Sequence, residues 1–447
     1  MKIVDYLIIG GSAAGTTAAG VIRSLKPDAS ITIVTDENHE QYSRVQLPHY
    51  IRHKVTREQL FLKKPDWYQE QRIELLKGNK QSFSTNKQSF STNKQSFSTN
   101  RVKSLENREH KVSLENGGEI QYRKLLIAIG GSVVKLSIPG SDLDNILYMR
   151  TIEDADEIIK LASASKKGVI IGGGFIGLEF TSCFKRNGVS DVTVLVVEPY
   201  YWQEKLDEAS SQVLTNTLEK NGVKVLTGEE VDHFEKGQTL TQGLTLKTKS
   251  GKTFEADVVG VGIGIRSDLS WLEGSGIKTN RAIVTNEFLE TNLPDVYAAG
   301  DCAEFKDVIF DRQHIMGNWA NATSQGSAVG KTMVHSASSG QAGQRTVFET
   351  ASSYSINYFD GACSFIGVTD DKFADEVVSR GSVEAGKMVR IYIKTISGVM
   401  RIVGATVINN PAEVAPLTSA VKNKIDIFKY KIRLSDSNFD LKNLLES

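Results

Sequence analysis

The chain contains the same local pattern twice: an apolar run, a glycine-rich turn, a helix-forming run and a second apolar run that ends on an acidic residue. The first turn is Gly10-Gly-Ser-Ala-Ala-Gly15, and its acidic residue is Asp36. The second turn is Gly172-Gly-Gly-Phe-Ile-Gly177, and its acidic residue is Glu198. In both copies the acidic residue follows the last glycine by 21 positions. The equal spacing predicts two strand–turn–helix units. Such units belong to α/β folds that are built on parallel sheets, so we expect this fold class.

Each unit has the chemistry of a dinucleotide site. A glycine turn between a strand and a helix presents backbone N–H groups and the positive end of the helix to a pyrophosphate. An acidic side chain about 20 residues further on accepts hydrogen bonds from ribose hydroxyls. In the first copy Ser12 replaces the middle glycine, and its hydroxyl can donate to a phosphate. The predicted ligand residues are Gly10, Ser12, Ala13, Ala14, Gly15, Asp36 and Glu37 in the first unit, and Gly172, Gly174, Phe175, Ile176, Gly177 and Glu198 in the second.

Composition excludes several classes of protein. The 53 basic and 53 acidic side chains give no net charge, which argues against a nucleic-acid partner, because such proteins carry a basic excess. No stretch approaches the roughly 18 apolar residues of a membrane span, and the N-terminal apolar run breaks into glycines too early for a signal peptide. The three cysteines, Cys183, Cys302 and Cys363, form no CxxC or CxxxxC pair. We therefore expect a cytoplasmic protein in a reducing compartment.

Residues 79–99 are three identical copies of Asn-Lys-Gln-Ser-Phe-Ser-Thr. The unit is too short for a solenoid and lacks the two apolar positions per heptad of a coiled coil. We interpret it as an exposed insertion, without which residues 73–78 and 100–117 would join as one strand running into a hairpin. A functionless expansion and a partner-binding role both stay open.

Two glycine turns could mean that the chain binds two dinucleotides, or that the unit was duplicated and one copy no longer binds. The segment Asp295-Val-Tyr-Ala-Ala-Gly300-Asp301 decides between these alternatives. With the two turns, it resembles the pyridine-nucleotide-dependent flavoprotein reductases, which include ferredoxin and rubredoxin reductases, NADH oxidases and the reductase portion of nitrite reductases. The resemblance implies FAD in the first unit and a nicotinamide dinucleotide in the second. Glu198 would repel a 2′-phosphate and favours NADH, while the nearby Lys205 leaves some use of NADPH open. No metal site is expected.

The resemblance also implies a domain order. An FAD-binding domain comprises residues 1–146 and 268–343, with the nicotinamide domain, residues 147–267, inserted into it. Residues 344–447 form a small α+β domain at the subunit or partner interface, and a homodimer is left open. The alternation of Met388, Arg390, Tyr392 and Lys394 predicts an antiparallel sheet with one face covered, followed by a helix from Pro411.

Further site residues follow from the resemblance alone. It places Asp301 at the flavin ribityl hydroxyls, Arg44 at the pyrophosphate, and Glu179 near flavin N5 with His49 as its cationic partner. His49 facing solvent at the start of a helix is the alternative. The remaining cofactor-binding positions are Ala128, Gly130, Gly262, Gly300 and Trp319.

The cysteines restrict the electron acceptor. A thiol relay needs adjacent sulfurs, which this chain lacks, and Val45 stands where related oxidases and peroxidases carry a single reactive cysteine. The interpretation is hydride transfer from NADH to FAD, then electron transfer to a rubredoxin-type or ferredoxin-type protein. A flavin-only NADH oxidase and a redox-sensing protein like apoptosis-inducing factor are the alternatives.

Overall fold

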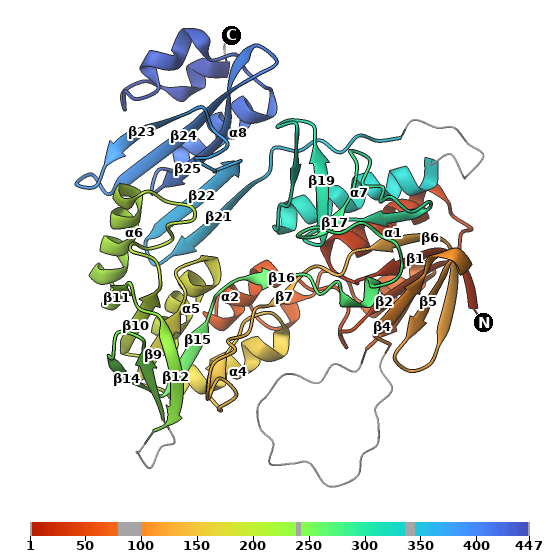
Figure 1. Cartoon of the computed structure of the whole chain (residues 1–447), viewed down its shortest axis with the longest axis horizontal. Coiled ribbons are helices and arrows are strands. Elements are labelled where there is room, and N and C mark those ends of the chain that lie inside the picture. Colours follow the sequence, from red (N-terminus) through yellow and green to blue (C-terminus); the bar gives the residue numbers. More distant parts are fainter. Residues whose placement is uncertain (1, 79–99, 238–242, 336–344, 446–447) are drawn as a thin grey trace.

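A computed structural model of the chain describes residues 2–78, 100–237, 243–335 and 345–445. The first sheet contains the first glycine turn, in the strand order β3-β2-β1-β6-β5-β4, with β18 added beside β6. Strands β1, β2, β3, β6 and β18 are parallel, and β4 and β5 are antiparallel to their neighbours. Helices α1 and α7 pack against each other beside this sheet (Figure 1). The bounds are β1 Lys2–Ile9, α1 Ala13–Leu25, β2 Ile31–Thr35, β3 Ile73–Lys77, β4 Val102–Glu106, β5 Lys111–Leu114, β6 Glu119–Ile127, β18 Val296–Ala298 and α7 Trp319–His335.

The two arms of the heptapeptide insertion are separate strands. Strand β3 lies at one end of the strand order and β4 at the other, so the prediction that they join as one strand is wrong. The hairpin of β4 and β5 is confirmed. The side chain of Asn100 donates to the carbonyl of Lys77 at 2.6 Å, so the two ends of the insertion meet although the strands do not pair. The repeats themselves lie outside the described residues.

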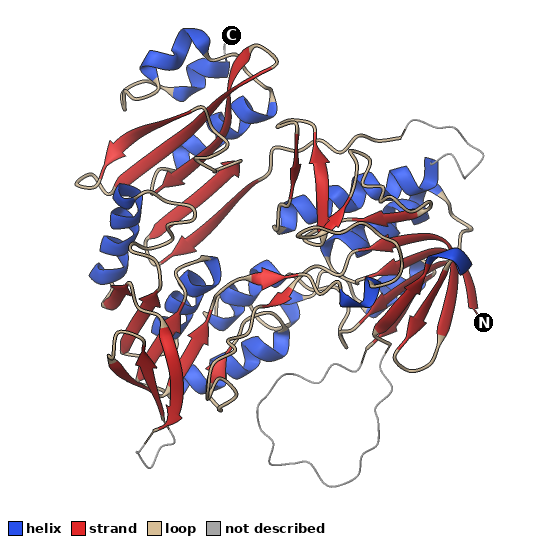
Figure 2. Cartoon of the chain, in the orientation of Figure 1, coloured by secondary structure: helices blue, strands red, loops and turns tan. Residues whose placement is uncertain are grey.

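The second glycine turn belongs to a second parallel sheet, of order β11-β10-β9-β15-β8. Its helices α4, α5 and α6 and a small antiparallel sheet, β12-β13-β14, complete this part (Figure 2). The bounds are β8 Ile146–Leu147, α4 Ile152–Ser163, β9 Lys167–Ile171, α5 Phe175–Arg186, β10 Asp191–Val196, α6 Glu208–Lys220, β11 Val223–Thr227, β12 Val231–Lys236, β13 Leu244–Thr248, β14 Thr253–Ala256 and β15 Val258–Val261.

Two connections between these parts run side by side. Strand β7, Ser132–Val133, pairs antiparallel with β16, Ile265–Arg266. The hydroxyl of Ser267 donates to the carbonyl of Gly130 at 2.7 Å and ties one connection to the other. The remaining elements before the C-terminal sheet are α2 Leu47–Ile51, α3 Pro65–Glu70, β17 Ile283–Val284, β19 Ala303–Asp307 and β20 Arg312–His314. The domain boundaries given above stay a prediction.

The C-terminal part is an antiparallel sheet of order β21-β22-β25-β24-β23. The prediction of one covered face is wrong, because Val389, Ile391 and Ile393 are buried as well as Met388 and Tyr392. Helix α8 packs on β22 and β25, while α5 packs on β21 and α6 on β24. The sheet therefore has helices on both faces. The bounds are β21 Ser353–Tyr358, β22 Gly361–Gly367, β23 Glu376–Ser382, β24 Lys387–Ile396, β25 Val399–Ile408 and α8 Val414–Lys422.

The buried side chains form separate clusters that follow this arrangement. One lies between α1, α7 and the first sheet, another inside the C-terminal sheet and α8. The largest joins the second sheet to one face of the C-terminal sheet, including Tyr358, Cys363 and Phe365. Tyr358, Cys363 and Phe365 therefore belong to the core. No helix in the described ranges is long and apolar enough to cross a membrane.

Candidate dinucleotide and redox site

The two glycine turns have the same backbone packing. A Cβ atom at Gly15 would lie 2.0 Å from the carbonyl oxygen of Gly10, and one at Gly177 would lie 2.0 Å from that of Gly172. Gly10 and Gly172 both have positive φ, 113° and 106°. Because β-carbon atoms never approach a carbonyl so closely, each turn needs glycine at its first and last positions. The repeated sequence pattern thus corresponds to a repeated three-dimensional unit.

The helices that follow these turns begin without side-chain caps. Ser12 and Gly174 occupy the N-cap positions of α1 and α5, neither side chain caps the helix, and neither first turn has an acidic residue. In contrast, Asp207 caps α6, and Thr151 caps α4 in a capping box with Asp154. A helix start left free of caps and carboxylates suits an anion. The residues present therefore fit a phosphate at α1 and at α5.

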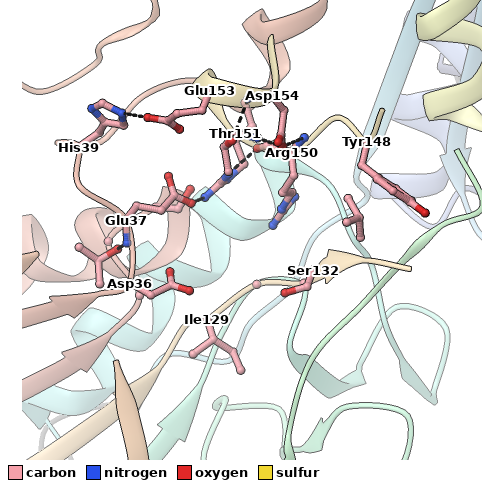
Figure 3. Close-up of a pocket in the computed structure, with 18 of the residues that line it drawn as sticks. Asp36, Glu37, His39, Ile129, Ser132, Tyr148, Arg150, Thr151, Glu153 and Asp154 are labelled. Carbon is pink, nitrogen blue, oxygen red and sulfur yellow. Dashed lines mark hydrogen bonds and ion pairs between the residues drawn. The ribbon is translucent and has the colours of Figure 1, made fainter. Parts of the chain in front are cut away.

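A cavity of about 480 Å³ extends from the first turn along the ends of β1, β2 and β6 (Figure 3). Asp36 and Glu37 line it where β2 ends, and Ile129, Gly130 and Arg150 line it from the neighbouring connections. His39 forms an ion pair with Glu153 across the cavity, which raises the pKa of His39 and lowers that of Glu153. The predicted residues Gly10, Ser12, Asp36, Glu37, Arg44, Ala128 and Gly130 all line this cavity.

Two arginines provide positive charge where this cavity meets the next. Arg44 forms an ion pair with Glu37 and donates to the carbonyl of Arg150 at 2.7 Å. Burial lowers the pKa of Arg150 to about 10, and the charge of Arg44 contributes to the shift. Burial raises the pKa of Asp301, and the two arginines partly offset that effect. An anionic group placed here would stabilise both cations, which fits a pyrophosphate. Arg150, which lines both cavities, is not among the residues that the sequence motifs indicated.

A second cavity, of about 1070 Å³, joins the first turn to the second. It adjoins the first cavity, and the two share wall residues such as Ser12, Arg44 and Gly130. The predicted residues that line it are Ser12, Ala13, Ala14, Arg44, Ala128, Gly130, Gly172, Gly174, Phe175, Ile176, Glu179, Glu198, Gly262, Gly300, Asp301 and Trp319. The predicted residues that line neither cavity are Gly15 and Gly177, which pack behind the turns, and His49.

Glu179 is one of the titratable groups in the wall of this second cavity. Burial raises its pKa to about 7, and the charge of Arg52 partly offsets the shift. Arg52 is buried at the end of α2 and donates to the carbonyls of Pro48 and Asn357 at 3.0 and 3.2 Å. A carboxyl group with this pKa can hold or release a proton near neutral pH.

His49 is not the partner of Glu179 in this structure. Among the described residues no hydrogen bond or ion pair joins the two, and the charges that act on His49 are those of Arg52 and Lys54, which with burial lower its pKa. The cation that acts on Glu179 is Arg52, three residues after His49, which the sequence reasoning missed. His53 lies beyond the end of α2 and forms a hydrogen bond with Asn187. The catalytic roles of Glu179 and His49 stay predictions.

The C-terminal sheet supplies part of the wall of the second cavity. Tyr354, at the start of β21, lines the second cavity. It lies beside Phe175 of α5, with ring centroids 4.9 Å apart, and Phe175 contacts Trp202 at 4.5 Å. The contact with Tyr354 is tilted and that with Trp202 is edge-on, and aromatic contacts of these kinds hold two elements at a defined separation. The wall near α5 is therefore fixed from two sheets.

The three cysteines lie away from both cavities. All are buried, and burial raises the pKa of Cys302 to about 12 and that of Cys183 and Cys363 further still. The thiol of Cys302 donates to the carbonyls of Ile127 and Ala299, each at 3.4 Å. Reactive cysteines are accessible thiolates, so these are packing residues.

Two glycine turns suited to phosphate groups, lining two neighbouring cavities with the carboxyl group of Glu179 in the wall of the second, are the arrangement of a reductase that binds two dinucleotides. Residues 4–326 match the family model described as pyridine nucleotide-disulphide oxidoreductase, and the chain belongs to this family. It is therefore an NAD(P)H oxidoreductase of this family.

Known proteins agree with this assignment. The chain is 29% identical over 308 residues to the nitrite reductase [NAD(P)H] of Bacillus subtilis, across 68% of this chain but only 35% of that enzyme. A putidaredoxin reductase, solved in covalent complex with putidaredoxin, has a TM-score of 0.85 at 24% identity and covers 99% of this chain and 98% of its own. The NADH:rubredoxin oxidoreductase of Clostridium acetobutylicum has a TM-score of 0.72 at 21% identity and covers 100% of both chains.

Proposed function

We propose that the chain transfers electrons from NADH through FAD to a small carrier protein of the rubredoxin or ferredoxin type. The observation that carries the proposal is the wall of the second cavity: it includes both glycine turns, Glu179 and Asp301, and no cysteine among the described residues that form it. Without a thiol relay beside the cofactors, the electrons pass directly to an acceptor from outside. The names of the reductases with the same fold support a carrier protein as this acceptor.

Each part of the chain has a separate task in this proposal. The start of α1 with Arg44 holds the FAD pyrophosphate, and Asp301 accepts hydrogen bonds from flavin-side hydroxyls. The start of α5 and Glu198 hold the NADH. Glu179 holds a proton between the two ligands, since its pKa is close to neutral. When bound, FAD supplies the acceptance of a hydride and the release of electrons one at a time.

Steady-state NADH oxidation tests the proposal. We expect slow oxidation in air, and oxidation that rises at least tenfold when a rubredoxin or a ferredoxin is added with cytochrome c as the final acceptor. Equal rates with oxygen alone would instead indicate an NADH oxidase. Negligible turnover with a long-lived complex after NADH addition would indicate a redox-sensing protein like apoptosis-inducing factor. The cytoplasmic location and the homodimer stay predictions.

A further inference from the structure

The turn after helix α8 exposes large apolar side chains. Residues Phe428–Arg433 form a short 3₁₀ helix, and Phe428 and Ile432 are 74% and 92% exposed. These are the two most exposed large apolar side chains in the described part of the chain, since the next, Ile3, is 66% exposed. Two such side chains on one turn are unusual on a surface that faces only water.

The residues of this turn that face the domain are apolar or aromatic, whereas those that face outward alternate between apolar and basic. Ile427 and Leu434 are buried, and Tyr430 is half-buried, so these residues hold the turn on the domain. The outward residues come as two pairs, Phe428-Lys429 and Ile432-Arg433. In each pair an apolar residue is followed directly by a basic one. We call residues 427–434 the basic-apolar turn.

The surroundings of the basic-apolar turn are positively charged. Residues 422–433 contain five basic side chains and one acidic side chain, Asp426. Lys424 and Lys431 form ion pairs with Glu349 and Glu376, each at 2.7 Å. The exposed Lys429 and Arg433 contact aromatic rings, those of Tyr430 and Phe439. Because both side chains are exposed, their charged groups can also reach an anionic surface.

The position of the turn argues against two binding partners, an electron-carrier protein and a second copy of this chain. Lys431 fixes it to β23, at the opposite edge of the sheet from β21, which lines the second cavity. Four strand spacings separate these edges, about 19 Å. Figure 1 shows the C-terminal segment at the outer end of the molecule. An electron carrier seated here would be separated from the cofactors by the sheet. A second copy related by a twofold axis through the turn would bring two basic turns together.

We propose that the basic-apolar turn binds the protein to an anionic lipid surface. Phe428 and Ile432 would enter the interface between headgroups and acyl chains, while Lys429 and Arg433 reach the lipid phosphates. Apolar side chains next to basic ones are the combination that such interfaces favour, because lipid burial and surface charge act together. Two projecting side chains suit a soft surface better than a protein interface, which buries about 800 Å² on each partner.

Vesicle sedimentation of the whole chain loaded with FAD tests this inference. We expect the protein to pellet with vesicles of phosphatidylcholine and phosphatidylglycerol, to remain in solution with phosphatidylcholine alone, and to be released by high salt. The double variants Phe428→Ser/Ile432→Ser and Lys429→Glu/Arg433→Glu should each weaken pelleting on the order of tenfold. All these residues are remote from the cavities, so NADH oxidation should be unchanged and reports correct folding.

Matched controls use exposed residues elsewhere on the chain. Ile3→Ser removes another exposed apolar side chain, and Lys278→Glu/Arg281→Glu reverses two exposed charges, and both should pellet like the unaltered protein. The inference would be overturned if the protein pelleted equally with neutral and with anionic vesicles. It would also be overturned if the double variants of the turn pelleted as well as the control variants. Retention of the protein on immobilised polyglutamate without vesicle binding would also overturn it and indicate an acidic protein partner. The inference would also be overturned if the protein does not bind vesicles but forms a dimer that dissociates in the variants.

Discussion

At the scale of single residues, Glu179 has the property that is most directly measurable. Its pKa is about 7 in the folded protein, against an ordinary value of 4.5. Below pH 4.5 the carboxyl group is neutral in both the folded and the unfolded state. As the pH rises from 4.5 to 7, the unfolded chain releases this proton first, so the folded state loses stability relative to it.

We therefore predict that Glu179→Gln stabilises the cofactor-free protein at pH 8 and has almost no effect at about pH 3, where the carboxyl group is protonated in both the folded and the unfolded state. The gain in the free energy of unfolding should be about 3 kcal/mol at most, because water in the open cavity reduces the cost of the charge. Urea unfolding at the two pH values measures it. The same difference between variant and unaltered protein at both pH values would contradict the predicted titration.

Arg52 and His49 can be distinguished by the same titration. The charge of Arg52 lowers the pKa of Glu179, so Arg52→Gln should move the titration of Glu179 to higher pH. His49→Gln should leave it in place. The pH dependence of steady-state NADH oxidation reports the midpoint in each variant. Arg52→Lys is the control for folding, because it keeps the charge. A shift caused by His49→Gln and not by Arg52→Gln would restore the pair that the sequence suggested.

At the scale of elements, two glycines of the second turn have different roles: one is needed for folding and the other for binding. A Cβ atom at Gly174 has no neighbour within 4 Å, whereas one at Gly177 lies 2.0 Å from a carbonyl oxygen. Gly174→Ala should leave thermal stability and FAD content unchanged but raise the KM for NADH about tenfold, because the methyl group occupies the phosphate position. Gly177→Ala should also cost about 1–3 kcal/mol in stability. Equal loss of stability in both variants would contradict this division.

The same elements show what could be predicted from the sequence. The strands, turns and helices of both dinucleotide units were predictable because glycine spacing and apolar runs act within about 30 residues. The partner of Glu179 was not, because α2 and α5 meet only through tertiary packing, and the side chain that acts on Glu179 belongs to Arg52 rather than to His49. The second covered face of the C-terminal sheet could have been predicted from the sequence, because the buried Val389, Ile391 and Ile393 alternate with Met388, Arg390 and Tyr392.

At the scale of the whole molecule, the cofactor site depends on parts distant in sequence. The walls of the second cavity come from both parallel sheets and from β21 of the C-terminal sheet. Arg390 of β24 forms an ion pair with Asp207, the cap of α6, at 3.2 Å, and so ties the C-terminal sheet to the second parallel sheet. The position of Tyr354 against Phe175 thus depends on contacts outside the cavity. A site assembled this way is difficult to foresee from its motifs alone.

The heptapeptide insertion, by contrast, should be dispensable for this assembly. The side chain of Asn100 reaches the carbonyl of Lys77, so removing residues 80–99 leaves a short link between ends that already meet. We predict that the shortened chain keeps its FAD content and NADH oxidation, and gains on the order of 1 kcal/mol because a shorter loop costs less entropy. Its balance changes from 53 basic and 53 acidic side chains to 50 and 53, a net charge of −3. Flavin absorbance, thermal unfolding and turnover measure these outcomes. Loss of activity toward the carrier protein, with FAD content and thermal stability retained, would contradict a functionless insertion and indicate that the repeats bind a partner.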